Sequence, residues 1–398
     1  MDRPTSSPHS TPVKKRSSVS TPLTDPNPPA ELSKDMHKQF VGPMPVADFL
    51  KDFVPKAPTP CPLSGDVFGK LKAHDDNAQK CDRAGATKRS FEDSFIDAVN
   101  ETGICPDLAL FNTTSNPVAE YVYDKTPDIS VCRRTSSADA LQTTTTGSAN
   151  APSSPRPIPP PARKLPIKSS SADHWSRLEL CIEAKRHTQD PFSDPSPNEA
   201  HERATYAFEK MALEAMSARG QLISYASAHM STQFRCFCFS VSIVNQTDAR
   251  LIRWDRTGAV VSERFDFTKA GSPLAEFLWR FNHLDDVQRG RDLSVTSTSE
   301  EETALARKHS MEGDIHKIQV TNDADKVDHY FVVSAPSVYR IKMSGRASSG
   351  YIGLDMQTKK KVWLKDSWRI CLDDMEKEFE IYKLLEEKKV RNIAPMVC

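Results

Sequence analysis

The sequence predicts an α/β (α+β) protein with a larger folded region followed by a smaller, strand-rich one at its C-terminal end. Three observations predict this class. Apolar residues at helical spacing alternate along the chain with short runs of β-branched and aromatic residues. Only 38% of the residues are hydrophobic, and 29 prolines against 14 glycines indicate unstructured segments between the folded parts. The length of 398 residues leaves room for two ordinary domains beside such segments.

The balanced overall charge gives no general attraction to nucleic acid or acidic lipid. Lys and Arg number 53 and Asp and Glu number 53, so no net charge attracts nucleic acid or acidic lipid. The polar, proline-punctuated N-terminus is not a secretory signal, and the longest apolar run, FCFSVSIV, is too short to cross a bilayer. The nine cysteines lack paired metal-ligand spacing and are expected to be free thiols. We therefore expect an intracellular protein, cytoplasmic or nuclear, without a membrane partner.

The first folded region is predicted to begin after a disordered tail. Residues 1–35 contain no aromatic side chain and are rich in Ser, Thr and Pro. Near Met36 the pattern changes, and Phe49 and Phe53 have the spacing of an amphipathic helix. A second helix is predicted in RSFEDSFIDAVNETG, where Gly103 is placed as its stop. The strand-like stretch VAEYVYDKTPDISVC follows it.

A disordered insertion is predicted to divide this region. Residues 134–172 are rich in Ser, Thr and Pro and cannot bury enough apolar surface to offset the entropy of ordering them. The folded pattern resumes at the strand HWSRLELCIEAK. It continues with a helix from about His201 to Met230, a strand in FRCFCFSVSIV, a hairpin turning at Thr257-Gly258 and a helix that begins at Pro273. The first region is therefore expected to comprise residues 36–133 and 173–295.

The smaller region is predicted to cover residues 326–398. It follows a linker, residues 296–325, that is rich in Ser, Thr and Glu at its start and has at most one exposed helix. Two strand-type stretches, YFVVSAPSVYRIKM and YIGLDMQTKKKVWLKD, precede a helix in DDMEKEFEIYKLLEEK.

Four residues of the smaller region suggest a nucleotide site. Gly345 and Gly350 lie in a turn, Lys365 lies in the strand VWLKD, and Glu378 lies in the following helix. In protein kinases such a turn approaches the ATP phosphates, the strand lysine contacts the α and β phosphates, and a helix glutamate holds the lysine. Because Ile381 and Tyr382 follow at the kinase spacing, Glu378 is the preferred partner, and Glu380 is the alternative.

Three phrases carry a resemblance to a known family. RWDRTGAVVSERFDF, GYIGLD…KKVWLKDSWR and EFEIYKLLEEKKVRNIAP resemble the fungal-type protein kinase family of mushroom-forming fungi, from about residue 36 to the C-terminus without the insertion. The resemblance implies ATP-dependent phosphorylation of Ser or Thr in proteins. It also implies that residues 326–398 form an incomplete kinase N-lobe, a sheet with one helix.

The resemblance also sets expectations about activity. Family members continue into a second lobe with an HRD-like catalytic loop and a metal-binding Asp motif, and neither follows Glu378 here. Ala347 replaces the middle glycine of the turn, which hinders close approach to a phosphate. We therefore expect a truncated family member whose ATP binding is weak or lost and which lacks kinase activity by itself. A protein supplying the missing lobe surface is the expected partner, because an isolated N-lobe leaves apolar surface uncovered.

A second set of candidate residues lies upstream. Asp128 follows Pro127 at one strand, Glu183 and Lys185 end another, and Gln221 and Tyr225 lie on the next helix. This order resembles the PD-(D/E)xK nucleases with their QxxxY helix, and it implies a restriction-endonuclease-like α/β domain. Two carboxylates on adjacent strands can share Mg²⁺, and a lysine two residues after the glutamate faces the same side of its strand.

Three functional hypotheses therefore remain open. The first is the kinase family function. The second is an Mg²⁺-dependent nuclease with Asp128 and Glu183 as metal ligands, Lys185 as the third catalytic residue and Glu92 or Asp93 as a further acid; nucleic acid is a partner only under this hypothesis. The third is a non-catalytic interaction scaffold.

Overall fold

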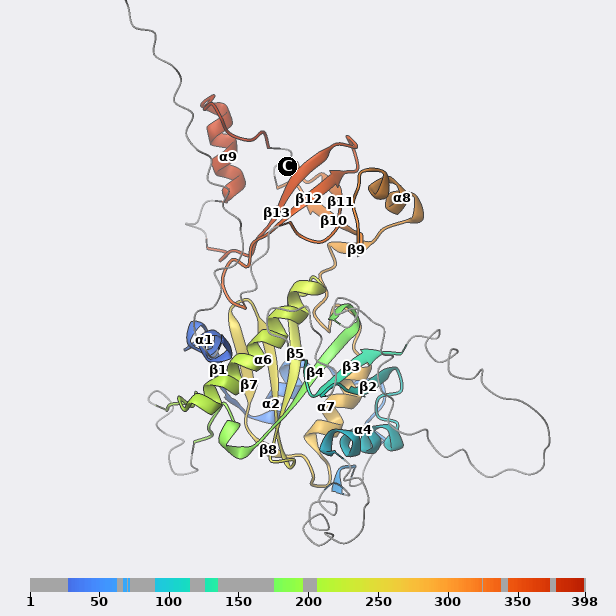
Figure 1. The fold of residues 1–398 in the computed structure, drawn as a ribbon, viewed down its shortest axis with the longest axis vertical. Coiled ribbons are helices and arrows are strands. Elements are labelled where there is room, and N and C mark those ends of the chain that lie inside the picture. The colour runs from blue at the N-terminus through green and yellow to red at the C-terminus, as the bar shows by residue number, and fades with distance from the viewer. Residues whose placement is uncertain are drawn as a thin grey trace, which may run out of the picture.

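The computed structural model describes ten stretches of the chain, and within them it confirms a mixed α/β protein. They are residues 28–62, 67–69, 71, 90–114, 126–134, 175–195, 206–323, 325–337, 343–372 and 377–396. These residues form an eight-stranded sheet and a five-stranded sheet, each with its own helices (Figure 1). Residues 1–27 of the predicted tail and 135–172 of the predicted insertion lie outside the described residues.

The larger sheet has the strand order β1-β7-β6-β5-β4-β3-β2, and β8 pairs with β6. The pairs β1–β7 and β4–β5 are parallel, and the others are antiparallel. The strands are β1 (Phe40–Met44), β2 (Leu108–Asn112), β3 (Ile129–Arg133), β4 (Leu178–Lys185), β5 (Phe237–Val244), β6 (Asp248–Asp255), β7 (Gly258–Ser262) and β8 (Phe265–Asp266).

Helices cover both faces of this sheet (Figure 1). One face packs α2 (Val46–Phe53), α4 (Phe91–Thr102) and α7 (Pro273–Asn282) through Phe49, Phe95 and Phe277. The other face packs α6 (Leu213–Thr232), which α1 (Pro28–Asp35) contacts. The short 3₁₀ helix η2 (His187–Gln189) follows β4. We call the sheet with these helices the eight-stranded unit. As predicted, Gly103 ends α4 in the left-handed conformation, and Pro273 is the first residue of α7.

For two predicted segments of this unit, the predicted boundaries are wrong. The last eight residues of the predicted disordered tail, Pro28–Asp35, form α1. Small residues replace the missing aromatics: Ala30 is buried, and Gly220 of α6 lets the Pro29 carbonyl approach where a Cβ would clash. The helix predicted from His201 begins only at Leu213, because Phe208 lies in an extended segment and stacks on Phe192 with ring centroids 4.9 Å apart.

The smaller sheet has the order β13-β12-β11-β10-β9, and every pair is antiparallel. Its strands are β9 (Val295–Ser297), β10 (His316–Thr321), β11 (Asp328–Val333), β12 (Ser349–Asp355) and β13 (Lys361–Asp366), and its helices are α8 (Glu300–Lys308) and α9 (Glu378–Glu387). We call this part the five-stranded unit.

The predicted linker over residues 296–325 is corrected by this sheet. It contributes β9, α8 and β10, so the unit begins at Val295 and not at residue 326. The alternation of Ile318 and Val320 in β10 was the missed signal, because both join the apolar cluster of the sheet. Helix α8 begins with a capping box between Ser299 and Glu302.

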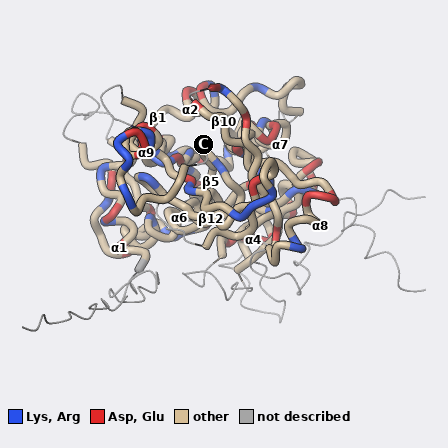
Figure 2. The backbone as a smooth tube through the Cα atoms, turned by 90° about the horizontal axis from the view of Figure 1, so that it is seen from above, with Lys and Arg blue, Asp and Glu red and all other residues tan. Residues whose placement is uncertain are grey.

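Acidic and basic residues are interspersed along the backbone (Figure 2). Helix α9, for example, carries both signs of charge, as does the segment around α8. Among the described residues, every helix is too short or too polar to traverse a lipid bilayer. The seven described cysteines are free thiols, as predicted for those positions.

Candidate functional sites

The predicted lysine and glutamate of the five-stranded unit form an ion pair. Lys365 lies near the end of β13, and Glu378 is the first residue of α9. The Lys365 Nζ donates to Glu378 Oε1 at 2.7 Å and to Oε2 at 2.5 Å. The side chains are 42% and 49% exposed, so water reaches both of them. The two residues that the sequence predicts as a pair thus connect β13 to α9.

The first turn of α9 explains why Glu378 and not Glu380 meets the lysine. Glu380 Oε2 accepts the backbone N–H of Lys377 at 2.9 Å and so caps the helix. The Lys377 amine pairs with Asp323, just beyond β10. Every residue of α9 is at least partly exposed. The two ion pairs therefore fix the beginning of the helix, while its body contributes little to the core.

The glycine turn, residues 343–350, has an unusual backbone. Gly345 has φ +87° and Ala347 has φ +38°, both in the left-handed region that glycine adopts most easily. The Gly345 N–H donates to the Arg256 carbonyl of the eight-stranded unit at 3.2 Å. Gly350 is required for another reason, because a Cβ there would clash with the Trp363 indole. Gly345 thus permits a left-handed backbone conformation, and Gly350 leaves room for the Trp363 side chain.

The upstream candidates also lie together. The Asp128 N–H donates to Glu183 Oε2 at 3.1 Å, and the Ala184 N–H donates to Asp128 Oδ2 at 2.9 Å. The Lys185 Nζ pairs with Glu183 Oε1. Glu183 is completely buried, and the Lys185 side chain is 12% exposed. The two carboxylates therefore occupy neighbouring strand ends, as the spacing predicted.

Burial raises the pKa values of both acids. The pKa of Glu183 rises to about 7, mainly because burial disfavours its charge; Lys185 opposes this rise, and Asp128 adds to it. Burial also raises the pKa of Asp128, against the opposing charge of Lys185. The charge of Glu92 adds to the rise at Asp128, whereas Asp93 accepts a hydrogen bond from Asn112 at 2.9 Å. Of the two acids considered as a third member, Glu92 is thus the one that acts on this site.

The predicted QxxxY pair connects α6 to the same place. The Gln221 Nε2 donates to the Tyr225 hydroxyl at 2.6 Å, and that hydroxyl donates to the Thr126 carbonyl at 2.8 Å. Thr126 lies two residues before Asp128, so α6 holds the chain segment that leads into the acid. Burial, aided by the charge of Glu183, raises the pKa of Tyr225. The tyrosine is therefore a neutral hydrogen-bonding residue.

A metal ion at this place would have few protein ligands. Among the described residues, no group of three or more His, Cys, Asp or Glu side chains is arranged to hold a metal. Asp128 and Glu183 supply two carboxylates, which suffices for Mg²⁺ when water and substrate oxygens complete its shell. The described residues therefore do not form a closed structural metal site, and both Glu183 oxygens already have partners in Lys185 and the Asp128 N–H.

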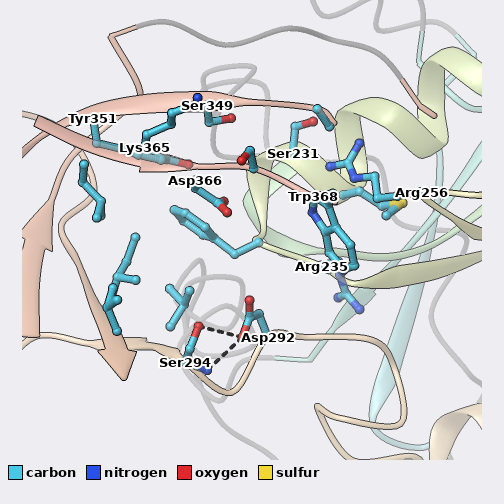
Figure 3. Close-up of a pocket in the computed structure, with 18 of the residues that line it drawn as sticks. Ser231, Arg235, Arg256, Asp292, Ser294, Ser349, Tyr351, Lys365, Asp366 and Trp368 are labelled. Atoms are coloured by element: carbon cyan, nitrogen blue, oxygen red, sulfur yellow. Dashed lines mark hydrogen bonds between the residues drawn. The ribbon is translucent and has the colours of Figure 1, made fainter. Parts of the chain in front are cut away.

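Sequence reasoning missed a third feature, a cavity of about 540 Å³ between the two units. In Figure 3 Ser349, Asp366 and Trp368 line one side of it, and Asp292 and Ser294 lie opposite. Arg256, from the β6–β7 turn, also lines it. No local pattern signalled this cavity, because it depends on how residues more than fifty positions apart in the chain meet.

These features describe an α/β protein whose smaller sheet is joined to a helix by an exposed lysine–glutamate ion pair. A family model described as fungal protein kinase matches residues 179–398, more than half of the chain, and the chain belongs to that family. This confirms the family prediction; its restriction to mushroom-forming fungi stays a prediction. No curated protein and no solved structure matches the chain. The match begins in β4 and therefore includes part of the eight-stranded unit.

Proposed function

We propose that this chain binds the phosphates of ATP through its five-stranded unit and serves ATP-dependent phosphorylation of Ser or Thr in proteins. The observation that carries the proposal is the Lys365–Glu378 ion pair between β13 and α9, with both carboxylate oxygens within 2.7 Å of the amine. In protein kinases such a pair must be in place before phosphate transfer. The family match supports the same function.

Each residue has a defined part in this proposal. Glu378 holds the amine of Lys365, which keeps a positive charge available for phosphate oxygens. ATP, when bound, supplies the phosphoryl group that is transferred. Transfer also requires an aspartate that positions the substrate hydroxyl and ligands for Mg²⁺, and we assign neither role to a residue of this chain.

The partner we propose is a protein that covers the exposed face around Lys365. Ile352 and Trp363 pair across β12 and β13 and are 48% and 58% exposed. They share the sheet face of Lys365, because alternate residues of a strand face the same side. On α9, Ile381 and Leu384 are exposed as well. Apolar side chains gathered in this way are typical of an interaction surface.

Nucleotide titration tests the first proposal. We expect the full chain to bind the non-hydrolysable analogue AMP-PNP with Mg²⁺, measured by isothermal titration calorimetry. Lys365→Met should weaken binding at least about tenfold, since it removes a charge-assisted contact. Lys361→Met is the matched control, because it changes a lysine on the same strand and face and should leave the affinity unchanged. Absence of binding, or equal effects of the two variants, would refute the proposal.

The upstream cluster favours a second function, metal-dependent cleavage of nucleic acid. The specific observation is that the Asp128 N–H donates to Glu183 Oε2 while the Ala184 N–H donates to Asp128 Oδ2, with Lys185 paired to Glu183. The two carboxylates would hold Mg²⁺, which activates water when bound. Lys185 would orient that water or stabilise the charge that develops on the phosphorus centre. Glu92 would add negative charge at Asp128.

Incubation with labelled single- and double-stranded DNA in Mg²⁺ or Mn²⁺ tests this second function. We expect cleavage that requires the metal and that Glu183→Gln abolishes. Lys365→Met should leave cleavage intact, which separates the two sites. If the chain cleaves neither substrate, the nuclease proposal is wrong. Failure of both this test and the nucleotide titration would leave the non-catalytic scaffold as the function that fits.

A further inference from the structure

The glycine turn of the five-stranded unit is anchored in the eight-stranded unit. Met343 is only 2% exposed and packs with Leu222, Ile223 and Trp254 in the apolar cluster between α6 and its sheet. The Ser227 hydroxyl donates to the Met343 sulfur at 3.6 Å. Two residues later, the Gly345 N–H donates to the carbonyl of Arg256. Side chain and backbone of the turn are thus both held by the other unit.

A side chain of the eight-stranded unit in turn packs against the five-stranded unit. Phe234, after α6, packs against Tyr351 with ring centroids 6.1 Å apart and against His316 at 5.1 Å. It belongs to the apolar cluster that contains Leu364 of β13. The face of the smaller sheet that carries Tyr351 and Leu364 is therefore the face that meets the eight-stranded unit.

The Lys365 side chain points to the sheet face opposite to that of Leu364. Lys365 follows Leu364 directly, and successive residues of a strand point to opposite sides. Its amine pairs with Glu378 there. The glycine turn is held on the face of Leu364, whereas the Lys365 amine is directed to Glu378 on the opposite face, although Lys365 also borders the cavity between the two units. In addition, the Gly345 amide, which would face a phosphate, already has the Arg256 carbonyl as its acceptor.

We propose that the eight-stranded unit is an autoinhibitory clamp on the glycine turn. It competes with nucleotide for the turn, so that a phosphate bound at Lys365 recruits the turn only after Met343 and Gly345 leave their contacts. This inference rests on the nucleotide site proposed above and adds its regulation. The open cavity beside the turn, which Ala347 and Ser349 line, leaves room for the turn to move.

Wild-type protein gives the first test, without any substitution. Saturating AMP-PNP with Mg²⁺ should increase the peroxide oxidation of Met343, read by mass spectrometry. The reason is that a released turn exposes a methionine that is otherwise buried. Unchanged or reduced oxidation of Met343 on nucleotide binding would overturn the clamp.

A substitution at the anchor gives the second test. Met343→Ala in the full chain should release part of the turn and tighten AMP-PNP binding about fivefold or more, because the fraction of binding-competent chain rises. Met356→Ala, a partly buried methionine in the cluster beneath α8, is the matched control and should leave the affinity unchanged. Weaker or unchanged binding by Met343→Ala would show that the contact supports the site or is neutral, and the clamp would be wrong.

The two proposals fail in different ways. If nucleotide binds and Lys365→Met weakens it, the proposed function stands, and Met343→Ala alone decides the clamp. If neither wild type nor Met343→Ala binds nucleotide, both proposals are overturned.

Discussion

The lysine–glutamate pairs of the two candidate sites have the same chemistry in opposite surroundings. Glu183 and Lys185 lie at the end of β4, where the carboxylate is fully buried. Lys365 and Glu378 connect β13 to α9, where each side chain is more than 40% exposed. In the buried pair a single strand sets the spacing, because residues two apart face the same side. In the exposed pair two separate elements must be brought together.

This difference determines what each pair can do. Low dielectric surroundings strengthen the interaction of buried charges but penalise each charge, which is why the pKa of Glu183 rises. An exposed pair is screened by water and contributes roughly 0–1 kcal/mol. The buried pair is therefore tightly coupled to folding. The exposed pair is free to exchange its partner for a ligand, as the proposed nucleotide site requires.

The same substitution in both pairs should give the largest contrast. Lys185→Met removes the charge and keeps much of the side-chain volume, which leaves Glu183 buried without its partner. We expect a loss of roughly 3 kcal/mol in the free energy of unfolding at pH 8, measured with urea. At pH 5 the loss should be smaller, because Glu183 is then protonated. Lys365→Met should cost less than about 1 kcal/mol. Equal losses would remove the distinction between the pairs.

The second prediction concerns pH. The pKa of Glu183 is about 7 in the folded chain, against 4.5 for an ordinary glutamate. Between these values the folded state binds more protons than the unfolded state, so its stability falls as the pH rises. Glu183→Gln removes this dependence. From pH 4 to pH 8 the unfolding free energy of wild type should therefore fall relative to the variant, by about 3 kcal/mol.

Thermal or urea unfolding across this pH range measures the difference. Wild type and variant are compared in the same buffers, so that all other titrating groups contribute to both. A difference between them that stays constant with pH would show that Glu183 is not the buried, protonatable group described here.

The two pairs also show what the sequence can predict. Lys365 and Glu378 were identified because their order matches a known pattern, and Glu183 with Lys185 because alternation in a strand is a local property. The β10 strand falls within the predicted linker, since its flanks are rich in polar residues. Helix α1 was missed because its packing depends on Gly220, nearly 200 residues away. The anchoring of Met343 was missed for a similar reason, as no local pattern records which unit a side chain will enter.

The smallest predicted effect concerns the glycine turn beside the exposed pair. Here the backbone conformation, and not burial, determines the change in stability. Ala347 has φ +38°, and a residue with a Cβ in this region carries strain of roughly 1–2 kcal/mol. Ala347→Gly relieves that strain but increases the entropy of the unfolded chain, which costs about 0.4–1 kcal/mol. Because the first term is the larger, we expect a net gain of about 0.5 kcal/mol in urea unfolding.

Gly345→Ala is the converse substitution in the same turn. The φ of +87° at Gly345 disfavours alanine, whereas an added Cβ would meet nothing within 4 Å. In the folded state, backbone strain is therefore the cost of this substitution, and no steric clash adds to it. The strain of roughly 1–2 kcal/mol is partly offset by the lower entropy of the unfolded chain, so we expect a net loss of about 0.5 kcal/mol. If Ala347→Gly destabilised the chain instead, the entropy of glycine would outweigh the strain at this turn. The alanine would then be a tolerated element of the turn and not a strained departure from a glycine-rich loop.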